Sequence, residues 1–386
     1  PPMPSPLFAR KPLEVLLAEL KGEDRLRRIL GPVQLSGLGV GAIIGTGIFV
    51  LTGVGAQKAG PALILSFVVS GLACVFAALC YAEFASMVPV AGSAYTYAYA
   101  TLGELLAWII GWDLVLEYTV TSATVAHGWS HYFQEFIGIF GLAIPKSLSI
   151  APFAYGGAGA AATGAYVDLP AILITIVVAA VLVKGIRESA SVNAAVVGLK
   201  LAVVLFVVVV GAFLVRPENW APFAPHGYAG FAFFGKFPFG PIDEHGHPLG
   251  MLAGAAIIFF SYIGFDSVST HAEEARRPQR DVPIGIISSL LICTVLYIAV
   301  TAVLTGMVPY GQIDVHAPVS AAFRQAGLPW AQFLISLGAL AGITSVLLVM
   351  MLSQPRVLLA MARDRLLPPS FFGAVHPKFR TPWKTT

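Results

Sequence analysis

Charged residues are scarce in this sequence. They make up 11% of the 386 residues, whereas hydrophobic residues make up 57% and the mean hydropathy is +0.81. Soluble domains carry roughly 25% charged residues, so this composition excludes an ordinary soluble protein. The formal net charge of only +3 gives no support for a nucleic-acid partner. We therefore predict an all-α polytopic membrane protein that is embedded in a lipid bilayer.

Cysteine and recognisable catalytic motifs are also scarce. The three cysteines lie in apolar runs without a CxxC pair, at Cys74, Cys80 and Cys293, which argues against a disulfide framework. No Ser/His/Asp or Cys/His arrangement emerges, so we predict no enzyme activity and no cofactor. His127, His131 and Glu135 follow at four-residue spacing, which permits metal binding, but they lack the HExxH order. We predict no metal site.

Long apolar runs dominate what the sequence does contain. About 20 helical residues cross a hydrocarbon core of roughly 30 Å, and eight runs reach that length. They cover about 34–56, 62–88, 103–138, 168–184, 191–215, 250–271, 283–308 and 330–361. A short helix is expected within 88–104, between spans 2 and 3. Lysine and arginine concentrate on one side of this topology, which places both termini in the cytoplasm.

Glycine interrupts the first run where a simple spanning helix would carry Leu, Ile or Val. The stretch GAIIGTGIF covers residues 41–49, and each glycine costs about 1 kcal/mol relative to alanine in a helix interior. The pattern recurs in the sixth run as FFSYIGFDSVS, residues 259–269. Two such interrupted segments in corresponding halves point to the binding site of a transporter. We therefore predict a solute transporter.

The interruption in span 1 predicts a site for a carboxylate. If the helix unwinds near Ile43–Gly45, the N–H groups of Gly45, Thr46 and Gly47 open a half-helix, whose positive dipole end suits an anion. The alternative is close helix packing, because Gly41 and Gly45 form a small-xxx-small motif.

The interruption in span 6 predicts a site for an ammonium group. Carbonyls freed around Phe260, Ser261 and Ile263 would accept its hydrogen bonds, with Gly264 at the break. Asp266 is an acid within the membrane, and such acids are functional by default because burial of an unpaired charge is costly. The alternative for Asp266 is a structural pair or an N-cap for the second half-helix.

Two further charged positions lie deep in predicted spans. Asp113 and Glu117 share a face of span 3, and two acids on one face favour a cationic partner or a proton site. Lys200 lies about 14 Å into span 5, where its ammonium must find carbonyls or an acid, or lose its proton. We predict a role in proton coupling. The alternatives are a structural role for Glu117, and for Lys200 a static counter-ion to Glu83, Asp113 or Asp266.

Five stretches together resemble the cationic amino acid transporter family of the amino acid–polyamine–organocation superfamily. They are GAIIGTGIFVLTG, GPALILSFVVSGLACVFAALCYAEFAS, GSAYTYAYATLGELLAWIIGWDLVLEY, FFSYIGFDSVSTHAEEARRPQRDVPIGI and AGITSVLLVMMLSQPR. The resemblance covers nearly all of residues 34–365, and the chain looks close to the bacterial proton-coupled members.

The resemblance implies a fold of five plus five inverted repeats, with discontinuous helices 1 and 6. It implies that the substrate carboxylate meets Ile44 to Gly47 and that the ammonium meets the carbonyls of Ile43, Phe260 and Ile263. In that family, acids matching Glu117 and Asp266 bind the basic side chain of the substrate, and a lysine matching Lys200 serves proton coupling.

The resemblance also implies a division of the chain. We expect a cytoplasmic N-terminus over 1–33, with an amphipathic helix at 11–30, and a first five-span repeat over 34–215. An extracellular loop over 216–249 is followed by spans 6–8 of a partial second repeat, 250–361, and by a cytoplasmic tail or loop, 362–386. Carriers of this family have at least twelve spans, so the fold is expected to be truncated here after span 8.

We therefore expect a secondary active transporter in the plasma membrane that takes up or exchanges cationic amino acids with protons by alternating access. Its partners would be the amino acid, protons and lipid; a small accessory membrane subunit is left open. The alternatives are a carrier of neutral amino acids or polyamines, and a sensor or channel-like protein that does not act as a carrier.

Overall fold

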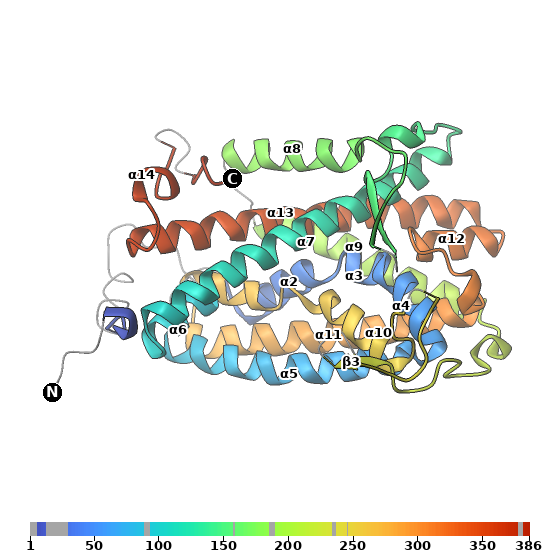
Figure 1. Cartoon of the computed structure of the whole chain (residues 1–386), viewed down its shortest axis with the longest axis horizontal. Coiled ribbons are helices and arrows are strands. Elements are labelled where there is room, and N and C mark those ends of the chain that lie inside the picture. The colour runs from blue at the N-terminus through green and yellow to red at the C-terminus, as the bar shows by residue number, and fades with distance from the viewer. Residues whose placement is uncertain are drawn as a thin grey trace.

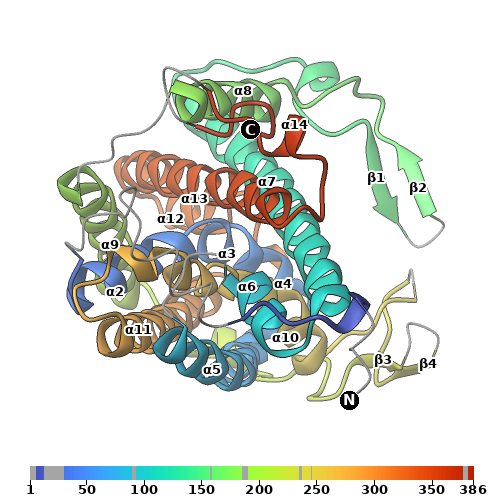
Figure 2. The same cartoon turned by 90° about the vertical axis from the view of Figure 1, so that its left-hand side faces the viewer.

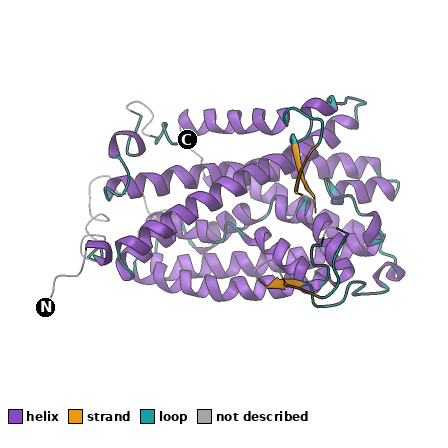
Figure 3. Cartoon of the chain, in the orientation of Figure 1, coloured by secondary structure: helices purple, strands orange, loops and turns teal. Residues whose placement is uncertain are grey.

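The computed structural model describes residues 6–12, 30–88, 93–156, 159–184, 190–233, 237–244, 246–376 and 381–386. The amphipathic helix predicted for the N-terminus lies almost entirely outside these residues. Helices dominate the described chain, and strands are confined to two short hairpins (Figure 3). The predicted all-α architecture is therefore confirmed.

The α-helices follow one another from the N-terminus in the order α2 Pro32–Ile43, α3 Thr46–Phe49, α4 Leu51–Ala59, α5 Leu63–Met87, α6 Ser93–Thr101, α7 Glu104–Gly138, α8 Leu169–Lys184, α9 Ala190–Ala212, α10 Met251–Ile258, α11 Pro278–Met307, α12 Pro318–Gln325, α13 Pro329–Arg363 and α14 Pro369–Phe372. The 3₁₀ helices are η1 Pro6–Phe8, η2 Gly60–Ala62, η3 Lys146–Leu148, η4 Pro217–Trp220, η5 Phe259–Tyr262, η6 Asp266–Glu274 and η7 Tyr310–Gln312. The antiparallel hairpins pair β1 Phe153–Gly156 with β2 Gly159–Ala162, and β3 Phe231–Phe233 with β4 Phe237–Phe239.

Six helical stretches among the described residues are long and apolar enough to cross a membrane. They are Leu51–Met87, Glu104–Gly138, Ala195–Ala212, Met251–Ala272, Pro278–Met307 and Pro329–Arg363. The other two predicted runs appear as the shorter apolar helices α2 and α8, and the short helix expected between spans 2 and 3 is α6. Each predicted run is thus mainly helical. The division into inverted repeats stays a prediction.

The two interrupted segments lie at the centre of the bundle. Helix α13 packs along α7 on one side, and α11 packs along α5 and α2 on the other. In Figures 1 and 2, α2 and α3 lie between these two groups of helices. The long loop 216–249 is held against the end of α4 by an ion pair of 2.6 Å between Lys58 Nζ and Asp243 Oδ2. The bundle therefore surrounds both breaks with protein.

Span 1 is broken between α2 and α3, as predicted. Ile44 is extended at φ −73° and ψ 107°, and Gly45 leaves helical geometry at ψ −125°. A methyl group on Gly45 would approach Val346 of α13 to 2.6 Å. The close approach of α13 therefore requires glycine at the break.

Span 6 is broken between η5 and η6, and its second half differs from the predicted α-helix. Residues Asp266–Glu274 form a 3₁₀ helix. Three side-chain hydroxyls in this segment donate to carbonyls three residues earlier, from Ser267 to Gly264, from Ser269 to Asp266 and from Thr270 to Ser267. Such local bonds compete with the i→i−4 ladder of an α-helix, which accounts for the tighter turn.

Gly264 joins the two breaks. Its φ of +113° lies in a region that favours glycine, and an added Cβ would lie 3.0 Å from the carbonyl oxygen of Ala42, near the end of α2. The break in span 6 therefore rests directly on the break in span 1.

We expect Gly264→Ala to destabilise the protein, because the alanine would combine a strained φ with a clash at Ala42. A strained backbone conformation costs about 1–3 kcal/mol, and thermal unfolding of the purified protein in detergent would measure the loss. Gly198→Ala is the matched control, since nothing lies within 4 Å of a Cβ at this helical position. Equal melting temperatures for both variants would contradict the assignment.

Candidate functional site

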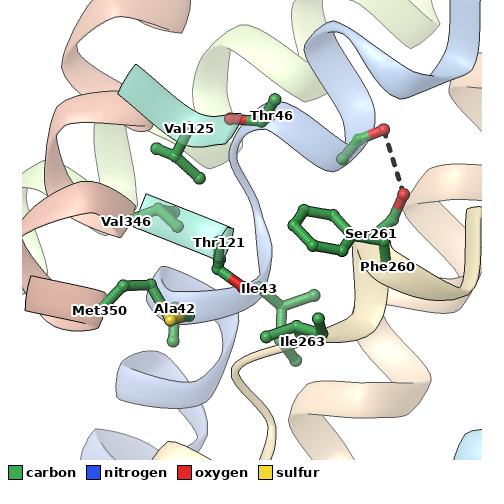
Figure 4. A pocket seen from close by; sticks show the side chains of 11 residues that line it. Ala42, Ile43, Thr46, Thr121, Val125, Phe260, Ser261, Ile263, Val346 and Met350 are labelled. Carbon is green, nitrogen blue, oxygen red and sulfur yellow. Dashed lines mark hydrogen bonds between the residues drawn. The ribbon is translucent and has the colours of Figure 1, made fainter. Parts of the chain in front are cut away.

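A cavity opens between the two breaks. It is small, with about 20 Å³ of room for the centre of a water-sized molecule, and it opens outward. The α2–α3 segment contributes Ala42, Ile43, Thr46 and Gly47; span 6 contributes Phe260, Ser261 and Ile263; α7 contributes Thr121 and Val125; and α13 contributes Val346 and Met350. Figure 4 shows the α7 and α13 side chains on one side of the unwound segment and those of span 6 on the other.

Six of the predicted substrate residues line this cavity. They are Ile43, Thr46, Gly47, Phe260, Ser261 and Ile263. Of the others, Ile44, Gly45 and Gly264 form the breaks themselves, while Glu117, Lys200 and Asp266 do not line the cavity. The two breaks are in direct contact, because a Cβ on Gly47 would lie 2.6 Å from that of Ser261.

Five lining residues were not predicted from the sequence, namely Ala42, Thr121, Val125, Val346 and Met350. Thr121 and Val125 follow Glu117 at intervals of four residues, so they extend the helix face that carries this acid. This four-residue spacing from Glu117 is the sequence signal that could have identified Thr121 and Val125. Val346 and Met350 are also four residues apart, but nothing distinguishes them from the apolar core of α13.

The polar end of the cavity is formed by the start of α3. The N–H groups of Thr46 and Gly47 lie in the first turn after the break, where no preceding turn supplies carbonyls. The side chains of Thr46 and Thr121 are each only 3% exposed. Among the described residues, their hydroxyls have no hydrogen-bond partner. Buried hydroxyls normally have a partner, and the described residues supply none to these two.

The carbonyls at the span 1 break are held by two side chains from elsewhere in the bundle. The Nζ of Lys200, which is 0% exposed, donates to the carbonyl oxygens of Gly41 at 2.6 Å and Ile44 at 3.1 Å. The hydroxyl of Tyr297 on α11 lies 2.8 Å from the carbonyl oxygens of both Ile43 and Ser261. The breaks are thus stabilised by protein rather than left bare in lipid.

Lys200 therefore finds carbonyls, which is one of the two environments predicted for it. None of the ion pairs recorded among the described residues involves Lys200. The static counter-ion alternative, with Glu83, Asp113 or Asp266, has no support in this part of the chain. The predicted role in proton coupling is not tested by this geometry.

The two acids predicted to read a basic side chain lie beside the cavity rather than in its wall. Asp266 is 5% exposed, and its carboxylate accepts a hydrogen bond of 2.9 Å from the hydroxyl of Tyr118 on α7. Glu117, the preceding residue of α7, is half-buried and interacts electrostatically with Asp266. Asp113 is exposed. Asp266 also begins η6, and contact of either acid with a substrate stays a prediction.

The histidines of α7 form a network with two other segments. His127 Nδ1 lies 2.7 Å from Asp168 Oδ2, and the Nε2 atoms of His127 and His131 are 3.0 Å apart. The ring of His131 lies 4.2 Å from that of His316. Glu135 accepts hydrogen bonds from Arg324 and Gln332, both at 2.7 Å. In the described part of the chain, no group of three or more His, Cys, Asp or Glu side chains is arranged to hold a metal ion.

Comparison with known proteins agrees with this architecture. The family profile described as "Amino acid permease" matches residues 30–386. The chain is 48% identical to the branched-chain amino acid permease BcaP of Bacillus subtilis, over 100% of this chain and 77% of that protein. It is 46% identical to a methylthioribose transporter of the same organism, over 99% of this chain and 77% of that protein.

A more distant relative carries the name that the sequence motifs suggested. The chain is 40% identical to the vacuolar cationic amino acid transporter 4 of Arabidopsis thaliana, over 98% of this chain and 60% of that protein. These relatives are named as transporters and permeases rather than enzymes, and the resemblance to this superfamily is confirmed. The chain belongs to the amino acid permease family and is a multi-pass membrane protein.

Proposed function

We propose that this protein is a secondary active transporter of neutral amino acids with apolar side chains. It works by alternating access in the plasma membrane, with its N-terminus in the cytoplasm as the distribution of Lys and Arg suggests. The observation that carries the proposal is the wall of the cavity between the breaks. Seven of the eleven residues that line it have apolar side chains, namely Ala42, Ile43, Val125, Phe260, Ile263, Val346 and Met350.

The opposite end of the cavity suits the backbone of an amino acid. A substrate carboxylate would accept hydrogen bonds from the N–H groups of Thr46 and Gly47 and from the Thr46 hydroxyl, at the positive end of a helical segment. The carbonyl oxygens of Ile43 and Ser261 would accept from its ammonium. The rest of the substrate then points toward the apolar wall.

A basic side chain fits this wall poorly. Burying an ammonium or guanidinium group without a partner costs several kcal/mol, and neither Glu117 nor Asp266 lines the cavity. The similarity to a permease that is named for branched-chain amino acids points in the same direction. We therefore favour the neutral substrate over the cationic one that the sequence predicted.

Cationic amino acids remain a second candidate because of one feature of α7. Glu117 is one helical turn from Thr121, which lines the cavity, and it interacts with Asp266. A long basic side chain that passes Thr121 would approach both carboxylates and relieve the repulsion between them. The similarity to relatives named as cationic amino acid transporters supports this alternative.

Competition for uptake separates these two candidates. In proteoliposomes that take up labelled leucine, isoleucine and valine are expected to compete roughly 10- to 100-fold more strongly than arginine or putrescine, because burial of an apolar side chain contributes about 1.5–3 kcal/mol. Stronger competition by arginine would favour the second candidate. Binding of amino acids without any uptake would indicate a sensor instead.

Replacement of Glu117 tests the role of the acids. We expect Glu117→Gln to leave leucine uptake within about threefold of wild type, because the Glu117 side chain does not line the cavity and glutamine keeps its volume. Loss of arginine uptake alone would support the second candidate. A large loss of leucine uptake, with normal amounts of folded protein, would contradict both assignments of this residue.

Proton coupling through Lys200 is the remaining part of the proposal. A protonated Nζ binds the carbonyls of Gly41 and Ile44 with a full charge, and loss of the proton would weaken the hold on the span 1 break. Coupling of this kind links the proton to the movement of the broken helix.

The dependence of uptake on pH checks this role. Uptake by the wild-type protein is expected to change between pH 5 and 8, whereas Lys200→Met, which keeps the volume but has no titrating group, is expected to give a flat profile. Lys146→Met, at an exposed position in η3, is the control and should follow the wild type. A Lys200→Met variant with the wild-type pH profile would end the coupling proposal.

A further inference from the structure

One side chain outside the cavity connects both broken helices. Tyr297 lies in α11 and is 0% exposed. Its hydroxyl oxygen is 2.8 Å from the carbonyl oxygen of Ile43, the last residue of α2, and 2.8 Å from that of Ser261, in η5. Both of these residues line the cavity. The sequence analysis did not single out this tyrosine.

The hydroxyl of Tyr297 has too few protons to donate a hydrogen bond to both carbonyls. A phenol has one O–H donor, and a backbone carbonyl can only accept. The hydroxyl of Tyr297 can therefore donate to only one of the two carbonyls at any moment, and the other is without that proton. An ammonium group has three N–H donors, so a substrate in the cavity can supply what Tyr297 alone cannot.

The position of the hydroxyl is fixed by an aromatic cluster behind the cavity. The ring of Tyr297 lies 5.1 Å from that of Phe67 and 5.5 Å from that of Tyr262. The hydroxyl of Tyr262 in turn donates to the carbonyl oxygen of Phe67 at 2.9 Å. Packed rings of this kind have few alternative positions. The hydroxyl of Tyr297 therefore keeps its position, and the carbonyl groups of Ile43 and Ser261 are oriented toward it.

We propose that Tyr297 is a positioning residue of the substrate site. Its hydroxyl holds the carbonyls of Ile43 and Ser261 close together at one end of the cavity. Since it can donate to only one of them, the other carbonyl accepts a hydrogen bond from the primary ammonium of the substrate. This inference rests on the proposed function, because it requires an amino acid in the cavity. Tyr297 would then make the site prefer substrates with a free amino group, although it does not line the cavity itself.

The test compares Tyr297→Phe with Tyr262→Phe. Both variants lose one buried hydroxyl from the same cluster, but only the first hydroxyl connects the two breaks. We expect Tyr297→Phe to raise the Michaelis constant for leucine about tenfold with little change in maximal rate, a factor typical of one hydrogen bond to a charged group. Tyr262→Phe is expected to lower the melting temperature and leave that constant near the wild-type value.

N-methylleucine separates positioning from packing. Its ammonium has two N–H donors instead of three, so the wild type should discriminate against it, and Tyr297→Phe should reduce the ratio of the two Michaelis constants. An unchanged ratio, equal effects of both variants, or tighter leucine binding by Tyr297→Phe would overturn the inference. Wild-type protein that binds no amino acid would instead overturn the proposed function, and the inference with it.

A second substitution keeps the test valid if Tyr297→Phe fails to fold. Para-aminophenylalanine introduced at position 297 has two N–H donors, which can satisfy both carbonyls at once. It should preserve or raise the melting temperature and yet weaken leucine binding, because no carbonyl is left short of a donor. If Tyr297 were purely structural, a higher melting temperature would not be accompanied by weaker leucine binding. A para-aminophenylalanine variant with unchanged leucine affinity would contradict the proposal.

Discussion

The structure depends on how the peptide groups of two interrupted helices find hydrogen-bond partners away from water. Lipid offers none, so irregular backbone at membrane depth must be served by protein or by a cavity. Lys200 reaches the carbonyls of Gly41 and Ile44 from α9, and Tyr297 reaches those of Ile43 and Ser261 from α11. The paired helices α5–α11 and α7–α13 surround this centre and keep it out of contact with lipid.

The same arrangement separates polar and apolar surfaces within the site. Thr46 and Thr121 line the cavity, whereas the carboxylate of Asp266 accepts a hydrogen bond from Tyr118 beside it. The carboxylates of Glu117 and Asp266 therefore lie close to the cavity but do not line it. The apolar wall in this chain is the basis for the neutral substrate that we propose.

Much of this was predictable from local sequence. The glycines of residues 41–49 cost helix stability and so indicated a break, with close helix packing as the alternative, and the recurrence at 259–269 marked the second break. The isolation of Lys200 in an apolar run predicted that it must find carbonyls or an acid, or lose its proton, and the structure places it on carbonyls. Asp266 was harder to assign, because an acid near a break suits both a substrate contact and a structural partner. The identity of Tyr118 as its donor depends on a contact 148 residues away in the sequence.

By itself the sequence determined the membrane class, the eight apolar runs, the two breaks and the position of the buried lysine, because hydropathy, glycine content and burial of charge act over short distances along the chain. Only the tertiary structure decided which side chains close the cavity and which carbonyls are already occupied. Val346 and Met350 resemble any other core residues of α13 until the fold brings them to the break. Tyr297 meets Ile43 across 254 residues, and no local pattern encodes a contact that exists only once α11 has packed against α2.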